Sequence, residues 1–140
     1  MGNKPQIILA LDVGEKRIGV ARGVASVGLA SPLTTLTNDD TIAARLAELC
    51  QQEQAELLVI GRPRNSQGQT TKQTAYTEQF VAGLKPQIVL PIVWQDESLT
   101  SVKAEQELSD RGQPFAKAEV DALAATYILE DYLQTETAHV

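Results

Sequence analysis

The sequence has very little of the side chains that most often carry acid–base or redox chemistry. Among its 140 residues there is one cysteine, one histidine, and an aromatic content of 4%. The lone Cys50 excludes a disulfide within the chain and is typical of a reducing compartment. The lone His139 lies in the last six residues, so a general-base histidine is not expected in a site.

Long hydrophobic runs are also missing. No apolar stretch is long enough to span a bilayer, and the opening MGNKPQ lacks the apolar segment of a signal peptide. With the single cysteine, these absences predict a cytoplasmic protein without a membrane partner. The length predicts one domain over residues 1–140, with a polar tail from about residue 135.

Positive charge is the minority charge. The chain carries 12 basic and 18 acidic side chains, which gives a net charge of −6. This balance argues against broad nucleic-acid binding through bulk electrostatics. An enzyme that gathers carboxylates around metal ions looks equally acidic before the metals are counted, so the balance leaves such an enzyme open.

Short apolar segments alternate with helical patterns along the chain. Strands are predicted at residues 7–12, 17–23, 29–37, 56–61 and 87–94. Helices are predicted after the capping residues 38–40, at 70–84, at 100–111 and at 117–133. Pro32 is expected to place part of the third strand at an edge or a bulge. Cys50 and Trp94 are expected in the core.

The order of these elements predicts an α/β fold. The first three strands follow one another closely and are expected to pair as antiparallel hairpins. The later strands are separated by helices, so they need crossover connections and are expected to be parallel. The result is a mixed five-stranded sheet flanked by helices.

Two isolated acids stand beside expected core positions. Asp12 continues the face of the first strand that carries Ile8 and Ala10, and Asp121 shares a helical face with Ala125 and Ile128. Structural interpretations exist for both. Asp12 could initiate a turn, and Asp121 could stabilise the positive end of a helix dipole.

A pair of acids closes the fifth strand. By alternation, Asp96 lies with Trp94 on one face and Glu97 lies with Val93 on the other. Either acid could cap the next helix, although Ser98 could also do so.

Taken jointly, these acids predict a metal site. Three carboxylates from neighbouring strand ends and an overlying helix repel one another strongly unless cations neutralise them. Hard oxygen ligands that leave positions for water and phosphate suit Mg²⁺ or Mn²⁺. Two such ions, about 4 Å apart, would serve phosphodiester hydrolysis.

Basic residues fall on expected loops near the same edge of the sheet. Each could be an ordinary solvated surface charge, but as a set they could hold phosphates beside the metals. The candidate substrate-binding residues are Lys16, Arg17, Arg62, Arg64 and Lys117. No aromatic stacking platform is apparent, which favours recognition of nucleic-acid shape over reading of single-stranded bases.

The segment LALDVGEKRIGVA resembles the opening of the YqgF/RuvX family of Holliday-junction resolvases, also described as pre-16S rRNA nucleases. The resemblance continues through GLASPLTTL, LLVIGRPRNSQG, DESLTSVKAE and VDALAATYIL, in the same order and over almost the whole chain. It implies a ribonuclease-H-like fold. It also implies a metal-binding, catalytic triad of Asp12, Glu97 and Asp121, with Asp96 in a supporting role or as the substitute ligand.

The chain departs from the family pattern beside this triad. The family usually has arginine where Ser98 stands, and the adjacent loop here contains Arg62 and Arg64. The expected function is a metal-dependent endonuclease that processes the 5′ end of pre-16S rRNA or resolves Holliday junctions, as a monomer or a homodimer. The alternatives are a non-catalytic interaction module and an actin-like phosphotransfer domain, although the latter fold needs two lobes.

Overall fold

The computed structural model describes residues 6–98 and 100–138, and its centre is one five-stranded sheet. The strands are β1 (Ile7–Val13), β2 (Arg17–Val24), β3 (Leu29–Thr37), β4 (Leu57–Pro63) and β5 (Ile92–Glu97). Their order across the sheet is β3-β2-β1-β4-β5. β1, β2 and β3 pair antiparallel, and β4 pairs parallel with both β1 and β5. The predicted mixed sheet is therefore confirmed.

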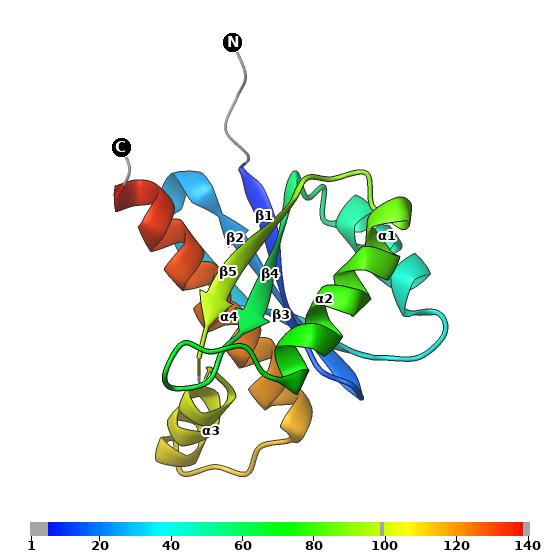
Figure 1. Cartoon of the computed structure of the whole chain (residues 1–140). Coiled ribbons are helices and arrows are strands. Elements are labelled where there is room, and N and C mark those ends of the chain that lie inside the picture. Colours follow the sequence, from blue (N-terminus) through cyan, green and yellow to red (C-terminus); the bar gives the residue numbers. More distant parts are fainter. Residues whose placement is uncertain (1–5, 99, 139–140) are drawn as a thin grey trace.

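Helices cover both faces of this sheet (Figure 1). Helices α1 (Ile42–Gln52) and α2 (Lys72–Leu84) pack on one face, against the apolar side chains of β1, β2 and β4. Helix α4 (Lys117–Ala138) packs on the other face, and α3 (Thr100–Asp110) packs against α4. Short 3-10 turns occupy Ala25–Val27 and Lys85–Gln87. Cys50, on the buried side of α1, is a core residue as expected.

Glycines let α4 lie unusually close to the sheet. A Cβ atom added to Gly19 of β2 would lie 2.0 Å from the carbonyl oxygen of Asp121, well inside van der Waals contact. At Gly61 of β4 an added Cβ would lie 2.4 Å from Cδ1 of Ile128. Because these positions have no side chain, the backbone of α4 rests directly on β2, and Asp121 is carried to the end of the sheet where β1 finishes.

The third strand behaves as its proline predicts. β3 lies at the edge of the sheet, and its register with β2 shifts between Val20 and Ala21, next to the pairing of Ala21 with Pro32. Proline has no backbone N–H to donate, so an edge position and an irregular register avoid a lost ladder bond.

The prediction for the fifth strand was wrong at both ends. Residues 87–91 are not a strand, because the 3-10 turn at Lys85–Gln87 and the prolines at 86 and 91 interrupt regular pairing. β5 starts at Ile92, which pairs with Leu58, and it continues to Glu97, which pairs with Pro63. β4 likewise extends two residues beyond its predicted end, so both acids of the Asp96–Glu97 pair are part of the sheet.

Two helix ends also differ from the prediction. The tail expected from residue 135 is helical through Ala138, and the Thr135 hydroxyl donates to the carbonyl of Asp131 within α4. His139 lies outside the described residues.

At α1, the cap residue is Thr41, and Asp39 contributes by accepting hydrogen bonds from the Thr41 backbone and hydroxyl. No helix in residues 6–98 and 100–138 is long and apolar enough to cross a membrane.

Replacement of Gly19 by alanine should destabilise the protein strongly. The added methyl overlaps the Asp121 backbone, which belongs to a helix and cannot move aside, so we expect a loss of about 3 kcal/mol in the free energy of unfolding. Urea denaturation followed by circular dichroism measures this loss.

Gly83→Ala is the matched control. Gly83 lies in α2, and an added Cβ there meets no atom within 4 Å. Alanine should raise stability at this position by about 0.5–1 kcal/mol, because it restricts the unfolded chain and favours the helix. Equal effects of the two substitutions would contradict the close contact between α4 and β2.

Candidate active site

Strand alternation places the three implied catalytic acids on one face of the sheet. Asp12 is on the face of β1 that packs against α4, two residues after the buried Ala10. Glu97 of β5 shares that face with Val93, which packs against the same cluster. Asp121 comes from α4 itself, which lies over this face. Asp96 has the opposite orientation, with Trp94 on the α2 side.

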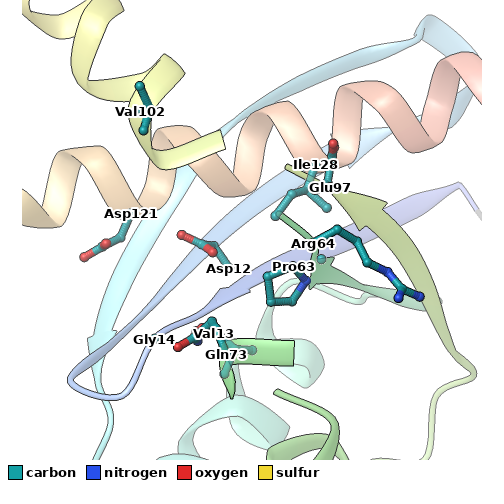
Figure 2. Close-up of a pocket in the computed structure, with 11 residues that line it drawn as sticks. Asp12, Val13, Gly14, Pro63, Arg64, Gln73, Glu97, Val102, Asp121 and Ile128 are labelled. Carbon is teal, nitrogen blue, oxygen red and sulfur yellow. The ribbon is translucent and has the colours of Figure 1, made fainter. Parts of the chain in front are cut away.

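The three acids line one cleft with a volume of about 410 Å³. Figure 2 shows Asp12 on the floor, with Asp121 to one side and Glu97 and Arg64 to the other. The remaining lining residues come from the end of β1, the end of β4, and helices α2, α3 and α4: Val13, Gly14, Gly61, Pro63, Gln73, Val102 and Ile128. The structure thus brings together the triad that the family resemblance implies.

Asp12 and Asp121 lie close enough for their charges to interact. Burial, together with the negative charge of Asp121, raises the pKa of Asp12 from 3.8 to about 7. Asp121 has a cationic partner, because Nε of Arg17 lies 2.5 Å from its Oδ2. Arg17 therefore contacts an acid of the triad directly. The sequence analysis had predicted only a phosphate-binding role for this arginine.

Glu97 has a different environment at the other side of the cleft. Burial raises its pKa well above the ordinary range, and a hydrogen bond with Asp131 and the charge of Asp131 act in the same direction, while Lys103 opposes them. Its Oε1 atom is buried and has no hydrogen-bond partner among the described residues. A buried carboxylate oxygen without a partner is costly, and an incoming cation would satisfy it.

Asp96 organises two arginines at the rim of the cleft. Its Oδ1 lies 2.8 Å from Nε of Arg62 and 3.7 Å from Nε of Arg64. Arg62 also lies over the Trp94 ring, 5.0 Å from the centroid, and 3.7 Å from Glu78. Trp94 is only partly buried, so its expected core role is combined with a contact to Arg62. These contacts suit the supporting role considered for Asp96 and keep it out of the cleft.

Side chains from outside the hairpin fix the turn between β1 and β2. Gln73 of α2 donates from Nε2 to the carbonyl of Val13 at 2.9 Å. Asn38 donates from Nδ2 to the carbonyl of Gly14 and to the Tyr76 hydroxyl, both at 2.9 Å. The residues on either side of the turn, Asp12 and Arg17, are thereby held in place relative to α2.

The five candidate phosphate contacts are not equivalent. Arg64 lines the cleft, and Arg17 is bonded to Asp121. Arg62 lies on the α2 side of the sheet, and Lys16 and Lys117 are exposed beyond the cleft-lining residues. The structure therefore brings Arg17 and Arg64 to the acids and leaves the other three outside the cleft.

Asp131 and Gln73 belong to the site but were missed in the sequence. A signal for Asp131 was present, because residues 121, 124, 128 and 131 fall at helical spacing and form one ridge along α4. Gln73 offers no such signal, since its partner is a backbone carbonyl 60 residues earlier in the chain.

The chemistry of the donors fits a hard divalent cation. The cleft offers carboxylate oxygens, one of which is buried and lacks a partner, and no competing histidine or cysteine lines it. In residues 6–98 and 100–138, however, no three acidic, histidine or cysteine side chains are arranged around one point that could hold an ion. Cation binding would therefore require side chains in this cleft to move.

This architecture is that of the ribonuclease-H-like class. RuvC of T. thermophilus, solved in complex with a Holliday junction substrate, superposes with a TM-score of 0.59 at 16% identity, over 95% of this chain and 96% of that one. The fowlpox virus Holliday junction resolvase gives a TM-score of 0.52 at 11% identity, over 92% of this chain and 99% of that one. At these identities the likeness shows a shared fold.

The sequence comparisons then define the family. The family model described as "RuvX: Holliday junction resolvase" matches residues 6–135, and the chain belongs to this family. A protein of Chloroflexus aurantiacus provisionally named pre-16S rRNA nuclease is 39% identical, over 96% of this chain and 90% of that protein. A protein of Neisseria meningitidis with the same provisional name is 40% identical, over 90% of this chain and 86% of that protein. The chain is thus an enzyme of a nuclease family and not an actin-like phosphotransfer domain.

Without metal, Asp12→Asn should stabilise the protein at neutral and higher pH. In the folded protein Asp12 keeps its proton up to about pH 7, whereas the unfolded chain loses it near 3.8. The stability that this group contributes is complete below the lower value and is lost as pH rises through the higher one. Asparagine does not ionise, so the variant should exceed wild type by about 4 kcal/mol at pH 8. Urea denaturation with EDTA, between about pH 4 and pH 8, measures the difference.

Asp39→Asn provides a control of opposite sign. Hydrogen bonds from Thr41 lower the pKa of Asp39, so the wild-type carboxylate contributes stability above the unfolded value and loses it as pH falls. The advantage of the Asp12→Asn variant should grow with rising pH, and the disadvantage of the Asp39→Asn variant should shrink with falling pH. A pH-independent effect of Asp12→Asn would contradict the burial argument.

Proposed function

We propose that the protein hydrolyses phosphodiester bonds in structured nucleic acid, with Asp12, Glu97 and Asp121 as its catalytic carboxylates. One observation carries the proposal: in a member of a nuclease family, three acids from two strands and a helix line the same cleft on one face of the sheet. The two strand acids lie at the carboxyl ends of β1 and β5, where ligands of α/β sheets commonly bind.

The three carboxylates would hold Mg²⁺ or Mn²⁺, most simply as two ions. A divalent cation bound there supplies activation of water and neutralisation of the charge on the departing oxygen. Asp12 and Asp121 are the closer pair electrostatically and would share one ion. Glu97 would contribute its buried, unpartnered Oε1, and the neighbouring Asp131 carboxyl would help to orient it.

Arginines at the cleft would hold the phosphates of the substrate. Arg64 lines the cleft, and Asp96 and its contact with Arg62 hold both guanidinium groups at one side of the site. Arg64 would supply the positive charge that Ser98 lacks where the family usually has arginine, and Arg62 would support it from the α2 side of the sheet. Asp96 would act as a support for the arginines and not as a metal ligand. Lys16 and Lys117 would contact phosphates farther from the cut.

The substrate would be either the 5′ region of pre-16S rRNA or a four-way DNA junction, the two activities named for the relatives. Both are folded nucleic acids with closely spaced phosphates, and the charged rim suits contacts to a backbone better than contacts to bases. A junction has two symmetric strands to cut, which would favour a homodimer. Processing of one RNA end needs only a monomer.

Removal of any of the three carboxylates should abolish cleavage. Asp12→Asn, Glu97→Gln and Asp121→Asn keep the shape of each side chain but remove the negative charge that holds a cation, so we expect rates to fall by about 10²-fold or more. The assay measures Mn²⁺-dependent cleavage of pre-16S rRNA ends and of a four-way DNA junction under the same conditions.

Two acids outside the proposed triad serve as controls for this assay. Asp110→Asn alters an exposed carboxyl on α3 and should leave the rate unchanged. Asp96→Asn should cost only a few-fold, because it loosens the arginines without removing a ligand. Equal losses for the Asp96 and Glu97 variants would overturn the assignment of Glu97. Wild-type protein that binds neither Mn²⁺ nor either substrate would favour a non-catalytic interaction module.

Arg64→Gln should weaken nucleic-acid binding through lost phosphate contact. In the plot of log affinity against log salt concentration, the slope should become shallower by about one phosphate contact. Fluorescence anisotropy with a labelled junction in Ca²⁺, which supports binding without requiring cleavage, gives the slope. Arg111→Gln, at an exposed residue just after α3 that pairs with Glu107, should leave it unchanged. A loss of affinity without change of slope would contradict a phosphate contact.

A further inference from the structure

The clearest feature that the proposed function leaves unexplained is the ion pair between Arg17 and Asp121. Arg17 is the first residue of β2, on the face that packs against α4, two positions before Gly19. Because Gly19 lies directly under the Asp121 backbone, the Arg17 side chain reaches the Asp121 carboxylate from the neighbouring turn. A residue expected to hold phosphate is instead bonded to an expected metal ligand, at 2.5 Å.

We propose that Arg17 is an exchangeable counterion, which balances Asp121 in the metal-free protein and is released when a divalent cation binds. This inference rests on the proposed metal site and concerns its regulation. Arg17 is then a positioning residue for Asp121 before metal binding, and its freed guanidinium becomes available for phosphate at the same edge of the cleft.

The geometry of the pair is suited to exchange. Arg17 bonds Asp121 through Nε alone, and no other partner for the guanidinium is found among the described residues. A two-pronged contact, in which both oxygens accept, is the stronger arrangement, and it is not formed here. The Arg17 side chain is 36% exposed and that of Asp121 is 17% exposed, so the arginine can leave toward solvent while the carboxylate stays in the cleft.

The charges of the cleft make the exchange necessary. Asp121 and Asp12 repel each other, and Arg17 is the only cation paired with either within the described part of the chain. No three acids there surround one point, so the described arrangement is that of a site balanced by arginine. A divalent cation at Asp121 would repel the guanidinium, and both cannot occupy the same carboxylate at full strength.

Direct Mn²⁺ binding by the full chain tests this exchange without substrate. Isothermal titration, with free Mn²⁺ counted independently by electron paramagnetic resonance, gives the dissociation constant. Arg17→Gln removes the competing cation, so Mn²⁺ should bind about three- to tenfold more tightly than to wild type. Arg17→Lys keeps the charge and should stay within about twofold of wild type.

Arg45→Gln is the matched control. Arg45 has the same 36% exposure of its side chain and its own carboxylate partner, Asp39, but it lies outside the cleft. Its substitution should leave Mn²⁺ affinity unchanged. Tighter binding by both glutamine variants would show a general effect of net charge and would overturn the proposal.

Thermal unfolding separates exchange from a purely structural role. With EDTA, Arg17→Gln should lower the melting temperature, and Mn²⁺ should raise it by more in this variant than in wild type. If Mn²⁺ does not restore the melting temperature that the variant loses, Arg17 has a purely structural role and the proposal is wrong. Unchanged or weaker Mn²⁺ binding would also overturn the proposal. If wild type binds Mn²⁺ and the shifts appear but no nucleic acid is cut, the proposed function fails while the counterion exchange stands.

Discussion

The contact between the backbone of α4 and the bare surface of β2 at Gly19 is the constraint on which the site depends. A helix normally rests on a sheet through its side chains, which keeps its backbone about 10 Å from the strands. Here an added Cβ would touch the Asp121 carbonyl at 2.0 Å, so the helix has moved in until backbone meets backbone. A carboxylate on the buried side of such a helix reaches the end of β1 without a long side chain. An aspartate is therefore sufficient at position 121, and the same approach seats Ile128 against Gly61.

Because the helix lies so close to the sheet, carboxylates gather in the cleft and repel one another. The structure offsets this repulsion in two different ways. Near Asp12, negative charge is balanced by a cation, since Arg17 is bonded to Asp121 and burial favours the protonated form of Asp12. Near Glu97, burial and the neighbouring charge of Asp131 favour the protonated form of the Glu97 carboxyl. Both arrangements are what a site for divalent cations needs when no cation is bound, because uncompensated buried carboxylates would destabilise the fold.

Local patterns in the sequence were sufficient for most of the fold, and alternation already separated Glu97 from Asp96. The period of two depends only on strand geometry, so it placed Glu97 with Val93 even though the start of β5 was misplaced by several residues, and in the structure that face packs against α4. Contacts between distant segments were the part that the sequence could not provide. Arg17 meets Asp121 across 104 residues, and Gln73 meets Val13 across 60. Neither contact leaves a periodic signal, and the family resemblance supplied the triad without supplying its counterion.

The negative net charge of the chain is a poor guide to what the protein binds. The net charge of −6 counts carboxylates that the site has collected in one place. Two divalent cations would add four positive charges, so −6 + 4 leaves about −2 for the loaded protein. The cation at Asp121 would also release one positive charge locally, since Arg17, no longer bonded to Asp121, presents its guanidinium to solvent at the edge of the cleft. Metal loading would then make the potential more positive at the point where a phosphate must enter, while the rest of the surface stays acidic and disfavours non-specific binding.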